Sequence, residues 1–494
     1  MPPPKGARQK IARGSAPRAE YDGATYGRRA AGWRRTRRDA NSELSPAVMA
    51  ALRGIARDLV RNNPFAARGV AEIAADIVGP GITFQVYRDG KVDNALNALA
   101  RRHFDSVDCD ASGRHDLYGL QLQAVRAIVE SGAAVMRRRW RRVTDRLPLP
   151  MQLQVLEPDY IDPSKHGPLA ADPGVNGGFV INGIQFNPLG KREGYWLYNG
   201  HPGSARSTSL GSTLIQARDV AHVFRADRPE QEHGATWFTP VILRMKDFGD
   251  YEDAQLTRQK IAAAYAAFVT SDDETSLPGI GNDADDGESG GYPDREPLDF
   301  VEPGTVSYLA PGQQVSFASP PGVDGYMDYS KVSLRAIAVG LGLPYEKLTG
   351  DLSDVSFISG RLGRLDYKRA VATWQWLMFI PQFCGSVERW FLEAAEMLGH
   401  DVRGVSMRWT PPRTEMLDPA NEVPANRDAV RSGQKTPSQV VREAGEDPDT
   451  FFEEFAQDLE RFDRLKLILD CDPRRVTAVG NPAQPKTATG EGSR

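Results

Sequence analysis

Residues 328–399 read DYSKVSLRAIAVGLGLPYEKLTGDLSDVSFISGRLGRLDYKRAVATWQWLMFIPQFCGSVERWFLEAAEMLG, and the rest of the chain is organised around them. Apolar residues from Ile358 to Leu398 recur every three to four positions with charged residues between them, which predicts one long amphipathic helix. About forty residues at roughly 1.5 Å each span roughly 60 Å, more than a compact domain needs. We expect a kink at Pro381, because its ring removes the hydrogen bond to the carbonyl of Leu377.

A shorter helix precedes the long one, and the loop that joins them covers residues 343–356. This loop carries Pro344, Gly350 and several Thr, Asp and Ser residues, whose side chains bond their own backbone more readily than they continue a helix. Lys347 is the only cation of the loop. The sequence therefore predicts helix, loop and long helix in that order.

The string LRAIAVGLGLPYEKLTGDLSDVSFISGRLGRLDYKR at residues 334–369 resembles the lambda-type portal proteins of tailed bacteriophages, which show a similar order and spacing of residue types. It departs from the family's Asn-Tyr-Ser-Ser-x-Arg string, to which only Ser359 and Arg361 align. Other blocks resemble the same family: RNNPFA at 61–66, EPDYID at 157–162, GIQFNPLGKREGYWLY at 183–198, VAHVFRADRPEQEHG at 220–234 and RSGQKTPSQVVREAGEDP at 431–448. The resemblance thus extends over most of the chain, from about residue 45 to 467.

The resemblance implies an α+β portal fold with long stem and wing helices, a β-rich wing, a clip insert and a helical crown, assembled as a ring that is typically dodecameric. It divides the chain into a basic N-terminal arm at 1–44, the first part of the wing at 45–238, a stem helix at 239–270, a clip at 271–327, a second stem helix at 328–342, a tunnel loop at 343–356, the long wing helix with a strand at 357–413, a crown at 414–470 and a disordered tail at 471–494.

The function that the resemblance implies is a head-tail connector at one capsid vertex. Double-stranded DNA would pass through its channel during packaging and ejection, and the terminase and later a head-completion protein or tail adaptor would dock on it. The major capsid or scaffold protein would surround it, and assembly would take place in the cytoplasm of the bacterial host. The implied tunnel loop faces DNA in the channel and contains four candidate contacts: Lys347, Thr349, Asp351 and Ser353.

A hydrolase or nuclease on a helical scaffold is the alternative function. Residues 287–291 match the nucleophile elbow G-x-S-x-G, but the sequence predicts no strand before them and no helix after them. Residues 282–293 fail as a calcium loop, because Ala284 and Pro293 occupy positions that need oxygen ligands. Neither Gly-Lys pair continues with Ser or Thr, so no P-loop motif is present. We therefore expect no catalytic residue, no metal and no cofactor, and ATP hydrolysis would belong to a separate partner.

The sharpest change in composition lies at residues 271–302, where eleven acids stand against one base, Arg295. A solvated loop is one interpretation. The alternative is a functional acidic surface that either docks basic partners such as the terminase or keeps passing DNA from sticking. The candidate docking residues are Asp283, Asp285, Asp286 and Glu288. A short hairpin is expected after them, at residues 304–317.

Two basic stretches each allow two interpretations. Residues 1–38 contain eleven Lys or Arg against Glu20 and Asp22, which fits either a solvated tail or an arm that neutralises phosphates or an acidic neighbour. Residues 137–142 (RRRWRR) suggest nucleic-acid binding, but a strand turns alternate side chains to opposite faces. An exposed sheet edge or salt bridges between subunits are therefore the preferred explanation.

The remaining elements follow from periodicity, caps and turn residues. Helices are predicted at 45–78 with a break at Pro64, at 116–130, at 239–269 with Thr239 as N-cap, and after Asp418, Thr436 and Asp447. Strands are predicted at 82–87, 133–143, 151–156 and 405–409, and residues 157–224 are β-rich with turns at 182–183, 188–190 and 199–200. An apolar stripe on the last helix predicts core packing, with Phe451, Phe455, Leu459, Phe462 and Leu465 as its members.

Composition sets the outer bounds. A chain of 494 residues can form roughly two to four domains. The three cysteines are far apart and no C-x-x-C occurs, so neither a disulfide framework nor a zinc cluster is supported, and a reducing compartment fits. No sufficiently long apolar run occurs, so we expect neither a membrane span nor a secretory signal.

Overall fold

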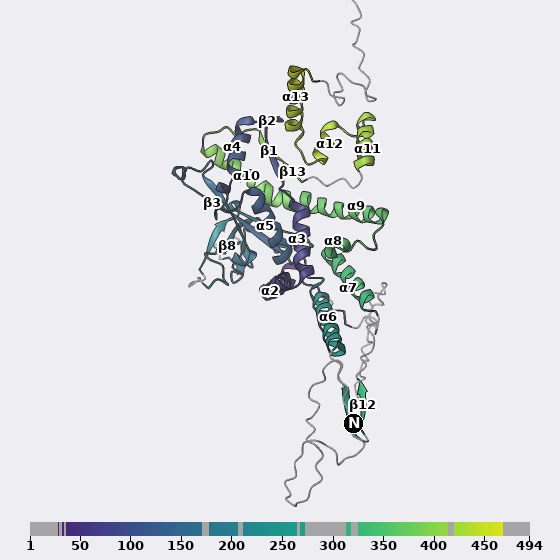
Figure 1. The fold of residues 1–494 in the computed structure, drawn as a ribbon. Coiled ribbons are helices and arrows are strands. Elements are labelled where there is room, and N and C mark those ends of the chain that lie inside the picture. Colours follow the sequence, from purple (N-terminus) through teal and green to yellow (C-terminus); the bar gives the residue numbers. More distant parts are fainter. Residues whose placement is uncertain are drawn as a thin grey trace, which may run out of the picture.

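The computed structural model describes residues 28, 32–33, 36–169, 177–205, 211–263, 267–271, 313–317, 325–412 and 419–467. Within them the chain is an elongated mixture of helices and sheets, which confirms the α+β class (Figure 1). A body occupies the middle, helices α6 and α7 extend below it, and helices α11 to α13 lie above it. No helix in these parts of the chain has the length and apolar composition needed to cross a lipid bilayer.

The body begins with helices α1 (Ala40–Glu43), α2 (Pro46–Asn62) and α3 (Pro64–Val78). Pro64 separates α2 from α3 as predicted, because proline lacks the N–H that would continue the first helix. The side-chain oxygen of Asn63 then caps α3 by accepting hydrogen bonds from the N–H groups of Phe65 and Ala66 at 3.0 and 3.1 Å. One face of α3 is buried, and it packs against α5 (Leu117–Ser131) at the centre of the body.

The described strands form four sheets. The first orders β13 (Val405–Thr410), β1 (Thr83–Arg88) and β2 (Lys91–Val92), and the second orders β10 (Val220–Phe224), β3 (Ala133–Trp140) and β4 (Met151–Leu156). The third contains β5 (Gly167–Pro168), β6 (Phe179–Ile181), β7 (Ile184–Phe186), β8 (Arg192–Tyr198) and β9 (Ser212–Gln216), and the fourth is the pair β11 (Ala267–Ser271) and β12 (Gln313–Phe317). All named strand pairs are antiparallel.

Strand β3 is the middle strand of its sheet, between β10 and β4. The prediction that its arginines lie along an exposed edge is therefore wrong for the start of the arginine block, because Arg137 lies opposite Val220 on one side and Gln154 on the other. The pairing with β10 stops at Arg137, so residues 138–140 pair with β4 alone. Periodicity could not reveal this, since it does not give the order of strands in a sheet.

The third sheet confirms the β-rich part and the turn predicted at residues 182–183. Asn182 and Gly183 connect β6 to β7 with positive φ values of 46° and 90°. Two consecutive residues of positive φ are what a tight two-residue hairpin turn requires, and Asn-Gly tolerates them best.

Helix α4 (Asn94–Phe104) is a helix of the body that the sequence pattern did not indicate. It begins after Asp93, whose carboxylate accepts a hydrogen bond from the N–H of Leu96 at 3.0 Å. Only four of its residues are buried, so its apolar pattern is short. The short 3₁₀ turns of the body are η3 (Val107–Cys109), η4 (Val143–Asp145), η5 (Pro158–Tyr160) and η6 (Ala217–Asp219).

Helix α6 (Ile242–Ala263) is shorter than the predicted helix at 239–269. Thr239 does not cap it, because its hydroxyl donates to the carbonyl of Thr236 at 2.6 Å. From Ala267 the chain is a strand, and β11 pairs with β12 rather than continuing the helix. Of the hairpin expected at 304–317, residues 304–312 lie outside the described residues, and residues 313–317 form β12, which pairs with β11.

Helix α7 (Tyr326–Leu341) is followed by the long helix, which extends over α9 (Phe357–Trp374), the π-helical segment η7 (Gln375–Cys384) and α10 (Gly385–Met397). Where we expected a kink, at Pro381, the helix is π-helical and therefore wider. At the end of this segment the N–H of Gly385 bonds to the carbonyl of Ile380, five residues back. The side chain of Gln382 ties the segment to β10 through two hydrogen bonds with the backbone of Phe224. The long helix therefore crosses the body and anchors the second sheet (Figure 1).

The last helices are α11 (Pro419–Arg431), α12 (Pro437–Glu443) and α13 (Pro448–Leu465), and each begins at its predicted proline. The apolar stripe of α13 is not core, so that prediction is wrong for the single chain. Phe451, Phe455 and Leu465 are 37%, 42% and 57% exposed. The reason is that α13 projects away from the body with α12 as its main neighbour (Figure 1).

Candidate functional site around the 343–356 loop

Two glycines shape the loop between α7 and α9. Gly342 ends α7 and Gly350 ends the short helix α8 (Tyr345–Thr349), and both have a φ of 76°. The loop predicted at 343–356 thus contains a helical turn, which begins directly after Pro344. Glycine suits both ends because the left-handed backbone carries no Cβ penalty there.

Helix α8 packs closely against α3. Leu348 is fully buried and Leu343 is nearly so. A Cβ added at Gly69 of α3 would lie 3.1 Å from Leu341 Cδ1 and 3.6 Å from Leu348 Cδ1. Gly69 therefore lets the first half of the loop approach the body, and this half is a fixed part of the fold.

Lys347 is held by the body through its side chain and its backbone. Its Nζ lies 2.5 Å from an oxygen of Asp76 and 3.7 Å from one of Glu72, both on α3. Its carbonyl accepts a hydrogen bond from Arg68 Nε at 2.8 Å. The Lys347 side chain is only 23% exposed, so its charge is neutralised within the chain.

Tyr367 of α9 completes this arrangement, which we call the Lys347 cluster (Lys347, Asp76, Glu72 and Tyr367). Its hydroxyl donates to Asp76 at 2.8 Å, and Lys347 Nζ lies 5.3 Å from its ring centroid. Burial, together with the charge of Asp76 and the hydrogen bond to it, raises the pKa of Tyr367. The cluster joins α3, α8 and α9, so it fixes the position of the loop relative to the long helix that follows it.

The second half of the loop is stabilised by local bonds. Asp351 accepts hydrogen bonds from the backbone N–H of Ser353 at 3.0 Å and from its hydroxyl at 2.6 Å. The hydroxyl of Thr349 donates to the carbonyl of Tyr345 at 2.9 Å and accepts from the N–H of Asp351 at 3.2 Å. The two bonds from Ser353, above all the one from its hydroxyl, lower the pKa of Asp351. Thr349, Asp351 and Ser353 thus form one turn, separate from the Lys347 cluster.

Residues 351–354, the loop tip, face outward. Leu352 is 68% exposed, and Ser353 and Asp354 are exposed as well. Lys331 of α7 holds the end of the tip through an ion pair with Asp354 at 2.7 Å. The tip is therefore accessible and carries two carboxylates.

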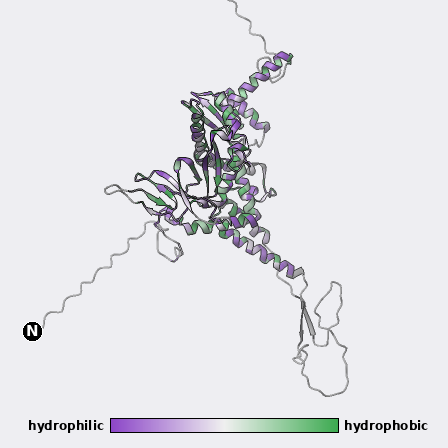
Figure 2. Cartoon of the chain, turned by 90° about the vertical axis from the view of Figure 1, so that its left-hand side faces the viewer, coloured by the Kyte–Doolittle hydropathy of each residue, from purple (hydrophilic) through white to green (hydrophobic). Residues whose placement is uncertain are grey.

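Helices α6 and α7 pack on each other below the loop and leave apolar residues exposed. Tyr251 of α6 contacts Tyr329 of α7 with ring centroids 4.3 Å apart. On the outer side of α7, Val332 and Val339 are 61% and 78% exposed. Figure 2 shows this pair extending from the body with hydrophobic and hydrophilic residues mixed along it. Both valines are therefore accessible on the same face of α7, two helical turns apart.

The four acidic residues predicted to dock partners, Asp283, Asp285, Asp286 and Glu288, lie outside the described residues. The structure describes the strands at the start of that segment and after it, β11 and β12. Strands β11 and β12 pair from Ala267 opposite Phe317 to Ser271 opposite Gln313. Ser271, where the acidic segment begins, therefore lies beside Gln313, which follows the segment in the chain.

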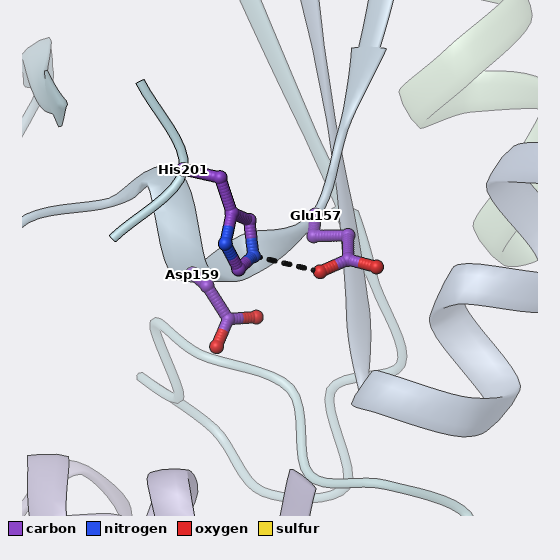
Figure 3. Close-up of side chains that lie close together, drawn as sticks. All are labelled: Glu157, Asp159 and His201. Carbon is purple, nitrogen blue, oxygen red and sulfur yellow. Dashed lines mark hydrogen bonds and ion pairs between the residues drawn. The ribbon is translucent and has the colours of Figure 1, made fainter. Parts of the chain in front are cut away.

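A carboxylate and histidine cluster lies in the body and was not indicated by the sequence. Glu157, Asp159 and His201 come within reach of one another, and His201 Nε2 lies 3.0 Å from a Glu157 oxygen (Figure 3). Arg57 of α2 contacts both carboxylates, with Nη2 at 2.5 Å from Asp159 and 2.9 Å from Glu157. Its guanidinium therefore occupies the position between the acids where a cation would bind.

The electrostatics of this cluster agree with a structural ion pair. Burial alone would raise the pKa of Asp159, but the hydrogen bond from Arg57 and the charges of Arg53 and Arg57 lower it below its ordinary value. The cluster joins α2 to the residues that precede the third sheet. It offers no open metal position, because Arg57 already pairs with both carboxylates. Only the spacing Glu157-Pro-Asp159 was visible beforehand, and two acids two residues apart carry no specific signal.

Residues 26–375 match the family model described as "Phage portal protein, lambda family". The chain belongs to this family. It is 24% identical over 441 residues to a probable portal protein of Halomonas phage phiHAP-1, covering 84% of this chain and 81% of that protein. It is 26% identical over 399 residues to the portal protein of Escherichia phage N15, covering 74% and 71%. A chain in the neck of a native gene transfer agent particle computed with C12 symmetry has a TM-score of 0.45 and 14% identity, over 82% of this chain and 95% of that chain.

The family match confirms the resemblance seen in residues 334–369. Portal proteins are structural components of the phage head-tail connector, so this portal-family chain is a capsid-associated protein of the phage particle. The loop, α7 and α9 lie within the matched residues, whereas nearly all of η7 and the whole of α10 lie beyond them.

Proposed function

We propose that this portal-family chain forms a closed ring at one capsid vertex, through which double-stranded DNA is packaged and ejected. The match of residues 26–375 to the portal family carries the proposal. The terminase would dock on this ring during packaging, and a head-completion protein or tail adaptor would follow it. The ring itself would have no hydrolytic activity, and the ATP that drives packaging would be hydrolysed by the terminase.

Exposed apolar residues on the long helices support a ring, because a single chain leaves them in water. On α7 and α9 these side chains are more than half exposed, for example Met327 at 71%, Val339 at 78% and Leu362 at 61%. Heterologous contacts that repeat around an axis close into a ring. A dodecamer is the subunit number we propose.

The 343–356 loop is proposed to face DNA with its tip and not with Lys347. Lys347 already has Asp76 as its partner, whereas Leu352 and Ser353 are exposed. Asp354 is paired with Lys331, so Asp351 would place the negative charge of the tip toward the phosphates, and the loop would guide the duplex without binding it tightly. Thr349 would stabilise the turn, since its hydroxyl accepts the hydrogen bond from the N–H of Asp351.

Mass photometry and electron microscopy of the purified full chain test the proposal. The expected result is a single large species with rotational symmetry and an axial channel. A protein that stays monomeric or dimeric under all assembly conditions would contradict the ring. Packaging assays with the terminase and linear DNA would then test the conduit separately.

A further inference from the structure

The far end of β3 borders a hollow of about 450 Å³ on the surface of the body. It is lined by residues 137–141, by residues 214–216 of β9 and by Asp219 of η6. The hollow opens where β10 stops pairing with β3. This leaves the end of the strand with β4 as its only paired neighbour among the described strands.

Two of the arginines there already have partners. Arg138 makes ion pairs at 2.5 Å with Asp219 and with Glu393 of α10, and its side chain is 1% exposed. Arg141 donates a hydrogen bond from Nε to Gln152 Oε1 at 2.7 Å. Asp219 is thereby neutralised, and it does not make the hollow acidic.

Arg137 and Arg139 are different. They lie two positions apart on the strand and therefore on the same face. In the part of the chain that the structure describes, no carboxylate forms an ion pair with either of them. Burial, followed by the charge of Arg139, lowers the pKa of Arg137. Two partly buried guanidinium groups thus lie side by side with their charges uncompensated by ion pairs, which favours an anionic ligand.

Strand β9 contributes an apolar side chain to the hollow, because Leu214 lines it and is 38% exposed. Trp140 lies one position from Arg139 and therefore on the other face of β3. There its ring contacts the Arg138 guanidinium, 4.2 Å from the ring centroid. A ligand that fills the hollow must therefore combine negative charge with an apolar group.

We infer that this hollow binds an acidic peptide segment of another protein, whose carboxylates pair with Arg137 and Arg139 and whose apolar side chain contacts Leu214. Planar guanidinium groups bind carboxylates bidentately, and an apolar neighbour in the peptide would cover Leu214. A DNA duplex presents phosphates on a convex rod and would leave Leu214 uncovered. The inference goes beyond ring formation and DNA transport, and it assigns a docking surface that the clip does not provide.

Fluorescence anisotropy with the full chain tests it. The probe is a labelled peptide Glu-Leu-Glu-Leu-Glu, compared with its Gln-Leu-Gln-Leu-Gln counterpart and with a short DNA duplex. We expect the acidic peptide to bind best and the double variant R137Q/R139Q to bind it about tenfold or more weakly. The matched control R101Q/R102Q removes two exposed charges from α4 and should bind like the wild type.

Each other outcome overturns the inference. Equal binding by R137Q/R139Q, with unchanged thermal unfolding, would mean that the arginines do not hold the peptide. Stronger binding of the duplex than of the peptide would make the hollow a nucleic-acid site. If R137Q/R139Q instead abolished the ring seen by mass photometry, the two arginines would serve contacts between subunits.

Discussion

At the scale of single residues, Lys347 shows how a cation in a loop can be structural. Its Nζ lies 2.5 Å from Asp76, with both side chains about one-quarter exposed. We predict that K347M and D76N each lower the free energy of unfolding by about 1–2 kcal/mol, because each leaves a partly buried charge without its partner.

The double variant K347M/D76N should lose less than the sum of the two, since neither charge remains. Urea unfolding of the four proteins gives the coupling energy. If D76N were neutral while K347M weakened DNA retention in a salt-dependent way, Lys347 would contact DNA and the anchoring role would be wrong.

Buried histidines predict a second residue-scale effect. Burial lowers the pKa of His103 and His233 to about 4, and that of His222 well below its ordinary value. The unfolded chain, in which a histidine titrates at about 6.5, therefore binds more protons than the folded chain below that pH. The free energy of unfolding should fall by about 1.4 kcal/mol per histidine for each unit from pH 6.5 toward 4.

Urea unfolding at pH 7, 6 and 5 measures this slope. The variant H103Q should have a shallower slope below pH 6.5, whatever its stability at pH 7. The control H400Q changes an exposed histidine and should keep the wild-type slope. An identical slope in H103Q would show that His103 is protonated in the folded chain.

At the scale of elements, periodicity and caps predicted most helices because those signals are local. Pro64 and Pro437 lie at the helix starts where they were expected, and the long helix extends to Met397. Predictions failed where the structure depends on neighbours that are far away in the sequence. The chain from Ala267 pairs as a strand with β12 where a helix was expected, and Phe455 is exposed because no described element covers it. The Lys347 cluster could not be predicted either, since Asp76 and Lys347 are far apart in sequence.

Helix α7 carries the element-scale prediction. Val332 and Val339 lie on its outer side and are 61% and 78% exposed. If a neighbouring subunit covers this face, the variant V332E/V339E should keep its helical circular dichroism and thermal unfolding but fail to form a ring. The reason is that burying an unpaired carboxylate in an apolar contact costs roughly several kcal/mol of binding free energy.

Mass photometry separates the outcomes for α7. The control L189E changes an apolar residue that is 92% exposed in a turn of the third sheet, and it should assemble normally. A ring formed by V332E/V339E would mean that this face of α7 borders solvent in the channel.

At the scale of the whole molecule, the proposed ring multiplies the charge of the acidic segment. Residues 271–302 carry eleven acids and one base, so about twelve copies would place roughly 120 net negative charges around one end. The pairing of β11 with β12 holds the chain before and after each segment together, so these charges would gather in one zone. Such a zone repels phosphates and attracts basic proteins.

The last prediction separates the two roles of that zone. Replacing Asp283, Asp285, Asp286 and Glu288 by Asn or Gln removes four charges per subunit and leaves the paired strands untouched. If the zone docks the terminase, binding should weaken and lose part of its dependence on salt, because fewer counterions are exchanged. If the zone keeps DNA from sticking, terminase binding should stay the same while DNA passage slows. Binding measured at several salt concentrations, together with packaging rates, distinguishes these results, and no change in either would make the segment a dispensable solvated loop.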